Sequence, residues 1–111
     1  MNCIFCAIAK GEIPATIVGR NDQALAFDDI NPKAPTHVLV IPTSHFDNVG
    51  ELALADPSSL KAIFELADEI AANRQLAGYR TVFNTGAEAG QTVFHAHLHL
   101  LGGRALQWPP G

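Results

Sequence analysis

The feature that most restricts the fold of this chain is the segment QTVFHAHLHLLGG, residues 91–103, in which His95, His97 and His99 alternate with apolar residues. Residues 93–101 contain no proline or glycine and are flanked by glycines, which is typical of a β-strand. Successive side chains of a strand point to opposite faces. The segment therefore predicts a strand that presents three imidazoles on one face, about 7 Å between neighbours, and an apolar row toward the core.

Patterns along the rest of the chain predict one domain, residues 1–111, of the α+β class. Turn-forming residues separate four further apolar segments, which we expect to form strands at 16–18, 24–27, 36–42 and 79–84. A long helix over 57–77 begins at a capping aspartate followed by proline and ends before a glycine. A short helix is expected over 3–10. Strands segregated around one long helix indicate a mainly antiparallel five-stranded sheet.

Composition and charge exclude several classes of function. A chain of 111 residues, 48% hydrophobic and 16% charged, suits one compact globular domain. Its net charge of −4 gives no electrostatic reason to bind nucleic acid. No apolar run approaches the length of a membrane span, and the N-terminus lacks a signal-peptide pattern. We therefore expect a cytoplasmic protein with neither a membrane nor a nucleic-acid partner.

Two chemistries suit a row of histidines on a strand. An H-x-H pair binds catalytic zinc in some hydrolases, but the large members need a barrel longer than this chain, and the small all-β ones would not carry the long helix. The other chemistry is covalent catalysis on phosphorus, in which a neutral imidazole attacks and its neighbours donate hydrogen bonds to phosphate oxygens. The glycine-rich loop 86–90 leads directly into the histidine segment and supplies backbone N–H groups for an anion.

The motif His-Ala-His-Leu-His-Leu-Leu resembles the signature of the histidine triad (HIT) superfamily. Over nearly its full length the chain resembles the Hint branch of that superfamily. The stretches that match are GEIPA at 11–15, LAFDDINPKAPTHVLVIP at 25–42, GYR at 78–80, GGR at 102–104 and WPPG at 108–111. The resemblance implies a HIT-like fold with sheets paired in a homodimer.

The same resemblance implies a purine nucleoside phosphoramidate hydrolase or nucleotidyl transferase, acting on substrates such as adenosine 5′-monophosphoramidate. Two alternatives remain open. A dinucleoside polyphosphate hydrolase of the same superfamily is disfavoured by the WPPG ending, which is particular to Hint-like members. A nucleotide-binding or scaffolding protein with incidental hydrolase activity can be separated from an enzyme only by measuring turnover.

Carried over to this sequence, the resemblance makes His97 the nucleophile of a nucleotidyl-histidine intermediate, with His99 and His37 supporting the charge on the phosphate. A satisfied histidine at the end of a strand is the alternative for His37. Asp29 would bind the ribose hydroxyls. Polar groups near the ribose and phosphate would come from Asn84, Gln91 and Thr92. Five apolar residues would form the base pocket, although core packing explains them equally well from sequence alone: Phe5, Ile13, Phe27, Ile30 and Leu39.

Cys3 and Cys6 form a C-x-x-C pair near the N-terminus. A redox pair expects a preceding strand and a βαβ context, which this position lacks. A zinc site needs two further ligands, and His45 and His95 have no other assigned role. Some bacterial histidine triad proteins look similar, pairing an N-terminal C-x-x-C with histidines at these two positions. We therefore expect a structural zinc at these four residues, a closed Cys2His2 site, with metal-free thiols and a redox pair as the alternatives.

The tail RALQWPPG carries the only tryptophan, Trp108. Chain ends usually fray, and tryptophan is enriched where protein surfaces meet. In Hint-like proteins this tail crosses the dimer interface and its tryptophan helps line the partner's active site. We therefore expect Trp108 to contribute to substrate binding in a homodimer. Packing of this side chain on its own subunit is the alternative.

Overall fold

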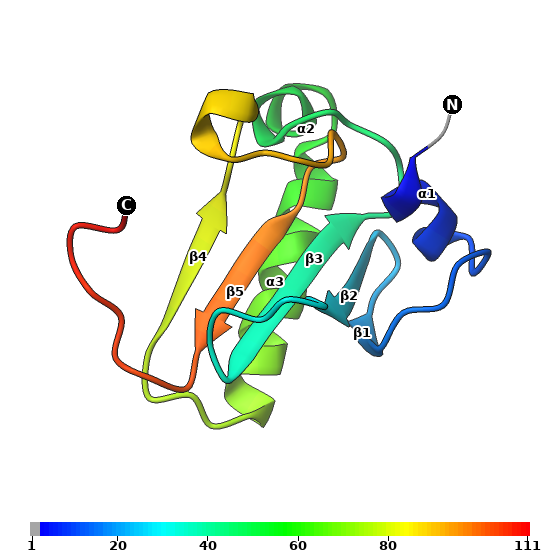
Figure 1. Ribbon diagram of the computed structural model, residues 1–111. Helices are drawn as coiled ribbons and strands as arrows, with labels where there is room; N and C mark the ends of the chain where they lie inside the picture. The colour runs from blue at the N-terminus through cyan, green and yellow to red at the C-terminus, as the bar shows by residue number, and fades with distance from the viewer. Residues whose placement is uncertain (1–2) are drawn as a thin grey trace.

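The computed structural model describes residues 3–111, which form a five-stranded sheet with helices on both faces (Figure 1). The strands β1 to β5 are Ile17–Arg20, Ala24–Asp28, Thr36–Pro42, Tyr79–Phe83 and Leu98–Gly102. Their order in the sheet is β1-β2-β3-β5-β4, and every neighbouring pair is antiparallel. The predicted α+β architecture is confirmed, and the predicted strand 36–42 is β3 without change.

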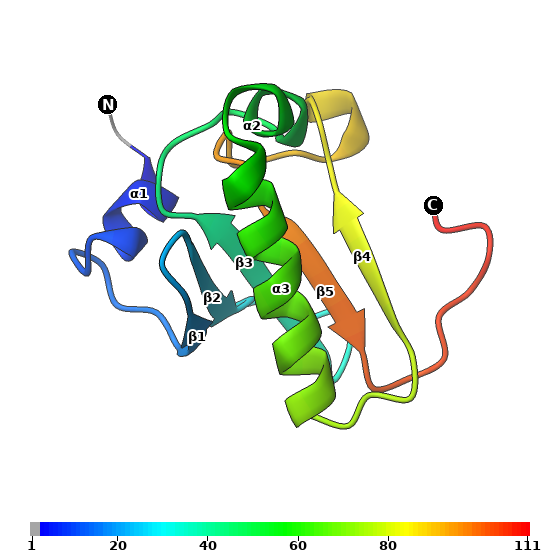
Figure 2. The same cartoon turned by 180° about the vertical axis from the view of Figure 1, so that it is seen from behind.

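The helices α1 to α3 are Ile4–Ala9, Val49–Ala55 and Pro57–Asn73, and a short 3₁₀ turn, η1, covers Ala87–Ala89. Helix α3 lies across one face of the sheet, as the view from behind shows (Figure 2). Helix α1 lies against the opposite side, beside the ends of β2 and β3. No helix among the described residues is long and apolar enough to span a membrane.

Strand alternation divides the core between the two faces of the sheet. On the α3 face, small and branched side chains of β2, β3 and β5 pack against the helix. On the α1 face, Leu25, Phe27, Leu39 and Ile41 pack against Phe5 and Ile8 of the short helix in a second cluster. Because His37 and His99 have the same parity as the α1-face residues of their strands, the functional histidines lie on the face that α3 leaves uncovered.

Helix α3 starts as predicted but ends earlier. The Asp56 side chain accepts a hydrogen bond from the Ser59 N–H, and Pro57 occupies the first turn. The prediction that Gly78 ends the helix was wrong, because the helix closes at Asn73. Gln75 adopts a positive φ of 54°, and Leu76 N–H donates to Ala71 C=O at 3.1 Å. This is a Schellman ending with glutamine in the position that glycine usually occupies, so the sequence carried no glycine to mark it.

Helix α2 was not predicted from the sequence. Its first turn is capped by Asn48, whose side chain accepts from the Glu51 N–H at 3.0 Å and donates to the Glu51 carboxylate at 3.2 Å. An Asn-x-x-Glu pair of this kind resembles the capping-box signature, which was the available signal. The first strand is β1, Ile17–Arg20, rather than 16–18, with a register shift between Ile17 and Gly19.

Candidate functional site

The histidine segment forms a shorter strand than predicted. Strand β5 begins at Leu98, so His95 and His97 lie in irregular backbone that precedes it. The Ala96 N–H donates to the Phe46 carbonyl at 2.7 Å, which directs this backbone away from the sheet. The predicted row of three imidazoles on one strand face was therefore wrong: His97 and His99 lie with ring centroids 4.9 Å apart, whereas His95 faces a different cluster.

Two strands position His37 and His99 beside one another. In the β3–β5 register His37 is opposite Leu101 and His99 is opposite Leu39, which places the two imidazoles at neighbouring positions on one face. Their Nε2 and Nδ1 atoms are 2.9 Å apart, and Asp29 Oδ2 lies 3.4 Å from the same His37 nitrogen. The structure thus brings together His37, His97, His99 and Asp29, four residues that the sequence proposed for one site.

A backbone carbonyl determines which nitrogen of His97 is free. His97 Nδ1 lies 2.8 Å from the His95 carbonyl oxygen, which can only accept, so Nδ1 carries the proton and Nε2 keeps a lone pair. The side chain is 8% exposed, and the edge of the Phe5 ring packs against it. Burial lowers the pKa of His97 from its usual value, and this favours the neutral imidazole that a nucleophile requires.

The two supporting histidines are also held neutral. Burial is the main cause that lowers the pKa of His37, and the Asp29 carboxylate partly opposes it. Burial together with the neighbouring His97 and His37 lowers the pKa of His99 to about 4. At neutral pH both rings are therefore uncharged, and any interaction of this pair with an anion would be through an N–H donor rather than through positive charge.

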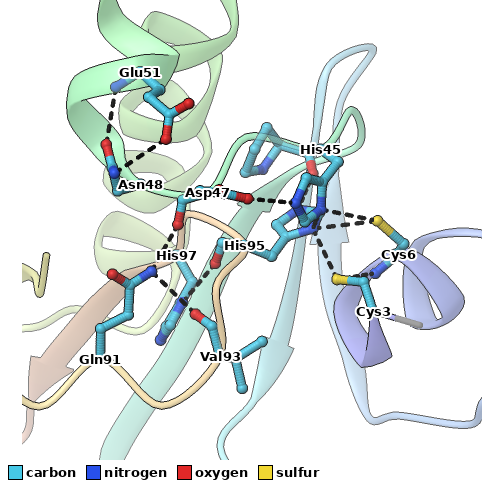
Figure 3. A network of polar contacts seen from close by, with 11 residues as sticks. Cys3, Cys6, His45, Asp47, Asn48, Glu51, Gln91, Val93, His95 and His97 are labelled. Carbon is cyan, nitrogen blue, oxygen red and sulfur yellow. Dashed lines mark hydrogen bonds and ion pairs between the residues drawn. The ribbon is translucent and has the colours of Figure 1, made fainter. Parts of the chain in front are cut away.

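A second cluster lies beside the first, where α1 meets the end of β3 (Figure 3). Cys3 caps α1, Cys6 lies one turn further along, His45 follows β3, and His95 precedes β5. Each cysteine Sγ lies 3.3–3.4 Å from a histidine Nδ1, and the two Nδ1 atoms are 3.2 Å apart. All four donor atoms lie within 4.8 Å of one another.

The outer contacts of the two histidines show that this cluster suits a cation. His95 Nε2 donates to the Pro42 carbonyl at 2.9 Å, and His45 Nε2 donates to the Asp47 carboxylate at 2.9 Å. Both Nδ1 lone pairs therefore face each other and the two cysteine sulfurs, an arrangement of four donor atoms that fits a shared cation. Zn–N and Zn–S bonds of about 2.0–2.3 Å in a tetrahedron separate the ligand atoms by about 3.3–3.8 Å, close to the observed spacing.

The thiols support the same conclusion. Burial and the neighbouring Cys3 sulfur raise the pKa of the Cys6 thiol, which disfavours a pair of thiolates without a compensating charge. A bound metal would supply that charge and deprotonate both sulfurs. Four protein ligands would leave no open position, so a metal held here would act on structure and not on substrate.

A further group of three possible ligand atoms, within 4.8 Å of one another, comes from Asp29, His37 and His99. The position of the ring proton on His37 does not suit metal binding. The Lys33 backbone N–H donates to His37 Nδ1 at 3.0 Å, so the proton of neutral His37 is on Nε2, the atom that faces the other two residues. A metal ligand needs a lone pair at that position. This cluster is therefore a hydrogen-bonded group rather than a metal site.

A pocket of about 650 Å³ opens beside His97 and His99 and is mostly apolar. Its volume suits a small organic ligand. Six of the residues proposed for substrate binding line it: Phe5, Phe27, Asp29, Ile30, Leu39 and Thr92. Sequence reasoning missed Ile8, Ala15 and Val93, which also line it and carry no signal beyond their apolar character. A second hollow of about 510 Å³ lies on the other side of His99 and is lined by Asn84, Lys33 and Pro110 among others.

Three proposed residues lie elsewhere. Ile13 lines a separate small hollow beside Lys10 and Arg20. The Gln91 side chain is 3% exposed, donates to the Asp47 and Val93 carbonyls and accepts from the Gly86 N–H, so its polar atoms hold the glycine-rich loop (Figure 3). Trp108 is 81% exposed in this chain and does not pack on its own subunit. Their roles toward a substrate stay predictions.

Comparison with known proteins gives one consistent result. Residues 10–106 match the family model described as the HIT domain. The structure of a HIT family hydrolase from Legionella pneumophila Philadelphia 1 is similar with a TM-score of 0.94 and 49% identity, covering 99% of this chain and all of that one. The 14 kDa zinc-binding protein of Zea mays is 46% identical over 97% of this chain and 87% of its own length. The structure of a histidine triad nucleotide-binding protein from Candida albicans is similar with a TM-score of 0.84 and 31% identity, covering 97% and 83% of the two chains.

Proposed function

This chain belongs to the HIT domain family, and from that premise we propose that it is a nucleoside phosphoramidate hydrolase or nucleotidyl transferase of the Hint-like type. Its substrates are purine nucleoside 5′-monophosphoramidates, with adenosine as the representative nucleoside. The observation that carries the proposal is the free Nε2 of buried, neutral His97, which stands between an apolar pocket and the His99 imidazole.

The proposed reaction has two displacements at phosphorus. In the first, the His97 Nε2 lone pair forms a bond to phosphorus while the phosphorus–nitrogen bond of the substrate breaks, and the amine leaves with a proton taken from solvent. The imidazole then carries positive charge, which the His95 carbonyl stabilises through the Nδ1–H bond of 2.8 Å. In the second, water attacks phosphorus, the bond to Nε2 breaks, and a proton is released. The product is a nucleoside monophosphate, and His97 is neutral again.

The surrounding residues support binding in a defined orientation. The apolar pocket between α1 and β2 accepts the base, with Phe5 and Phe27 in edge contact at 5.4 Å between ring centroids. Asp29 lies at the point where the two hollows meet, so its carboxylate suits the ribose hydroxyls. The amine leaving group then occupies the second hollow, which His99, Lys33 and Asn84 help to line.

A turnover panel with a trapped intermediate tests this function. Adenosine and guanosine phosphoramidates are compared with dinucleoside polyphosphates, and quenched reactions are examined by mass spectrometry for one nucleotidyl group on the protein. We expect phosphoramidates to be the best substrates and the adduct to be absent from His97→Ala. Preferred cleavage of dinucleoside polyphosphates would identify the alternative hydrolase. Tight nucleotide binding without turnover of any compound would identify a binding protein.

We further propose that zinc occupies the Cys3, Cys6, His45 and His95 site, as its donor geometry supports and as the name of the maize relative suggests. We also propose a homodimer in which the tail around Trp108 reaches the partner's active site, since this side chain has no packing role in its own chain. Cytoplasmic location remains a prediction from the sequence.

A further inference from the structure

The loop between β2 and β3 is fixed at several points. At its base, the Asp29 N–H donates to the His37 carbonyl at 3.0 Å. In its middle, the Lys33 N–H donates to His37 Nδ1 at 3.0 Å. From outside, the Arg104 guanidinium donates through Nη2 and Nε to the Lys33 carbonyl, at 2.8 and 3.2 Å. Lys33 therefore uses its N–H to hold a site histidine and its C=O to receive a side chain 71 residues away.

The residue before Arg104 holds the same loop by contact. Gly103 has a φ of 90°, and a Cβ at this position would lie 2.9 Å from Pro35 Cβ. Only glycine adopts this conformation readily and leaves room for the proline ring. Gly103 and Arg104 together, immediately after β5, thus clamp the loop of residues 29–36 at two points, one by close packing and one by a forked hydrogen bond.

The clamp determines the positions of two protons. Because a backbone N–H can only donate, His37 Nδ1 must accept, and the proton of the neutral ring is on Nε2. That Nε2–H points at His99 Nδ1, 2.9 Å away, so His99 Nδ1 must also accept. The proton of neutral His99 is then on its own Nε2, the nitrogen that is free of His37. The hydrogen bonds run in one direction from the Lys33 amide to His99.

We propose that Arg104 is a positioning residue for the active site, which holds Lys33 so that its amide fixes the Nε2–H tautomers of His37 and His99. The tautomers follow from the structure alone. Their catalytic consequence rests on the proposed function: His99 is presented to the phosphate as a donor. Without Arg104, the Lys33 carbonyl loses both bonds, the loop of residues 29–36 moves, and each imidazole can populate its other tautomer. A donor lost from the phosphate lowers transition-state stabilisation and not ground-state packing.

The chain offers a matched control. Arg80 of β4 donates from Nη2 to the carbonyl of Gln107 in the C-terminal tail, at 2.9 Å. Like the bonds of Arg104, this is a hydrogen bond from a guanidinium to a backbone carbonyl. Arg80 has no hydrogen bond to the 29–36 loop. Arg80→Ala therefore removes a guanidinium-to-carbonyl bond of similar length without touching Lys33. Arg104→Lys is the conservative variant, since a single ammonium replaces two converging N–H groups.

The tautomers are measured directly by long-range ¹H–¹⁵N correlation spectra of the imidazoles in full-length, ¹⁵N-labelled protein at neutral pH. Spectra of His37→Asn and His99→Asn assign the signals. In wild type we expect both rings to show a protonated Nε2 and an unprotonated Nδ1. In Arg104→Ala the His37 and His99 nitrogen shifts should move toward the average of two tautomers, in Arg104→Lys they should move less, and in Arg80→Ala they should stay at wild-type values.

Turnover is then compared on an adenosine phosphoramidate. We expect kcat for Arg104→Ala to fall by roughly 10- to 100-fold with little change in KM, as a misplaced catalytic donor produces, and Arg104→Lys to recover part of the loss. Melting temperatures identify any variant that does not fold, in which case Arg104→Lys carries the comparison.

Three results would overturn the inference: a proton on His37 Nδ1 in wild type, unchanged His37 shifts in a folded Arg104 variant, or averaged shifts with wild-type kcat. If the tautomers respond as expected but no phosphoramidate is turned over by wild type, the proposed function fails while the structural role of Arg104 stands.

Discussion

Removal of the metal should release helix α1 while the rest of the domain stays folded. The helix is joined to the domain chiefly by Phe5 and Ile8, which are 7% and 8% exposed. Their burial contributes about 3–6 kcal/mol. Fixing the backbone of six helical residues costs at least about 6 kcal/mol, so burial of these two side chains alone does not hold the helix. Zinc at the proposed site would link Cys3 and Cys6 to His45 and His95, and these bonds would decide the balance.

The assay is amide hydrogen exchange before and after treatment with a strong zinc chelator, with metal content measured in parallel. We expect residues 4–9 to exchange at least about tenfold faster after chelation, which corresponds to about 1.4 kcal/mol, while amides of α3 remain protected. Because Phe5 lines the apolar pocket, KM for a nucleotide substrate should rise with the same treatment. Cys6→Ser should reproduce the effect and remove any further response to chelator. Unchanged exchange in α1 after verified metal removal, or purified protein that never contains metal, would refute the reasoning.

Three further outcomes are expected. His97→Ala should lower kcat by several orders of magnitude while nucleotide affinity is kept, checked by single-turnover kinetics and calorimetry; near-normal turnover would exclude covalent catalysis at this residue. The free energy of unfolding should decrease as pH falls from about 6.5 to about 4, because unfolded His99 binds a proton in that window and folded His99 does not. This loss, taken as the change with pH in wild type minus the change in His99→Asn, is measured by urea unfolding at each pH. It should be at most about 3 kcal/mol, because solvent screening of the partly exposed ring reduces it. Deleting residues 105–111 should change the selectivity for the leaving group. Mixing the shortened chains with His97→Ala chains should restore wild-type selectivity if the tail acts across a dimer. Verified mixed dimers that do not recover this selectivity would contradict a role of the tail in the partner's site.

Most of the fold follows from local patterns in the sequence. Residues 38–42 are apolar on both faces, and the structure buries every residue of Thr36–Pro42 at the centre of the sheet. The Asp56–Pro57 pair likewise predicted the start of α3. The errors occurred where the usual local signal was missing or a tertiary contact replaced it. Gln75 closes α3 without a glycine, and the Ala96 amide bonds to Phe46 instead of a strand partner.

The histidines of the candidate site were predictable, but its geometry and part of its lining were not. The structure brings His37, His97 and His99 together, in agreement with the roles that the histidine triad resemblance implied for them. Nothing in the spacing showed that β5 would begin only at Leu98 and so leave His95 to turn toward the cysteines. The outer partners of the metal site, the Pro42 carbonyl and the Asp47 carboxylate, depend on backbone position and could not be derived from residue type.

His95 joins the two sites by using different parts of one residue. Its imidazole, fully buried, offers Nδ1 to the cysteine cluster and donates from Nε2 to Pro42. Its backbone carbonyl accepts a hydrogen bond from His97 Nδ1–H and so leaves Nε2, the proposed nucleophile, with its lone pair. A rotation of the His95 backbone would therefore disturb both sites at once. The turn of His95 toward the cysteines, which interrupts the regular strand, thus connects the proposed zinc site to the tautomer of His97.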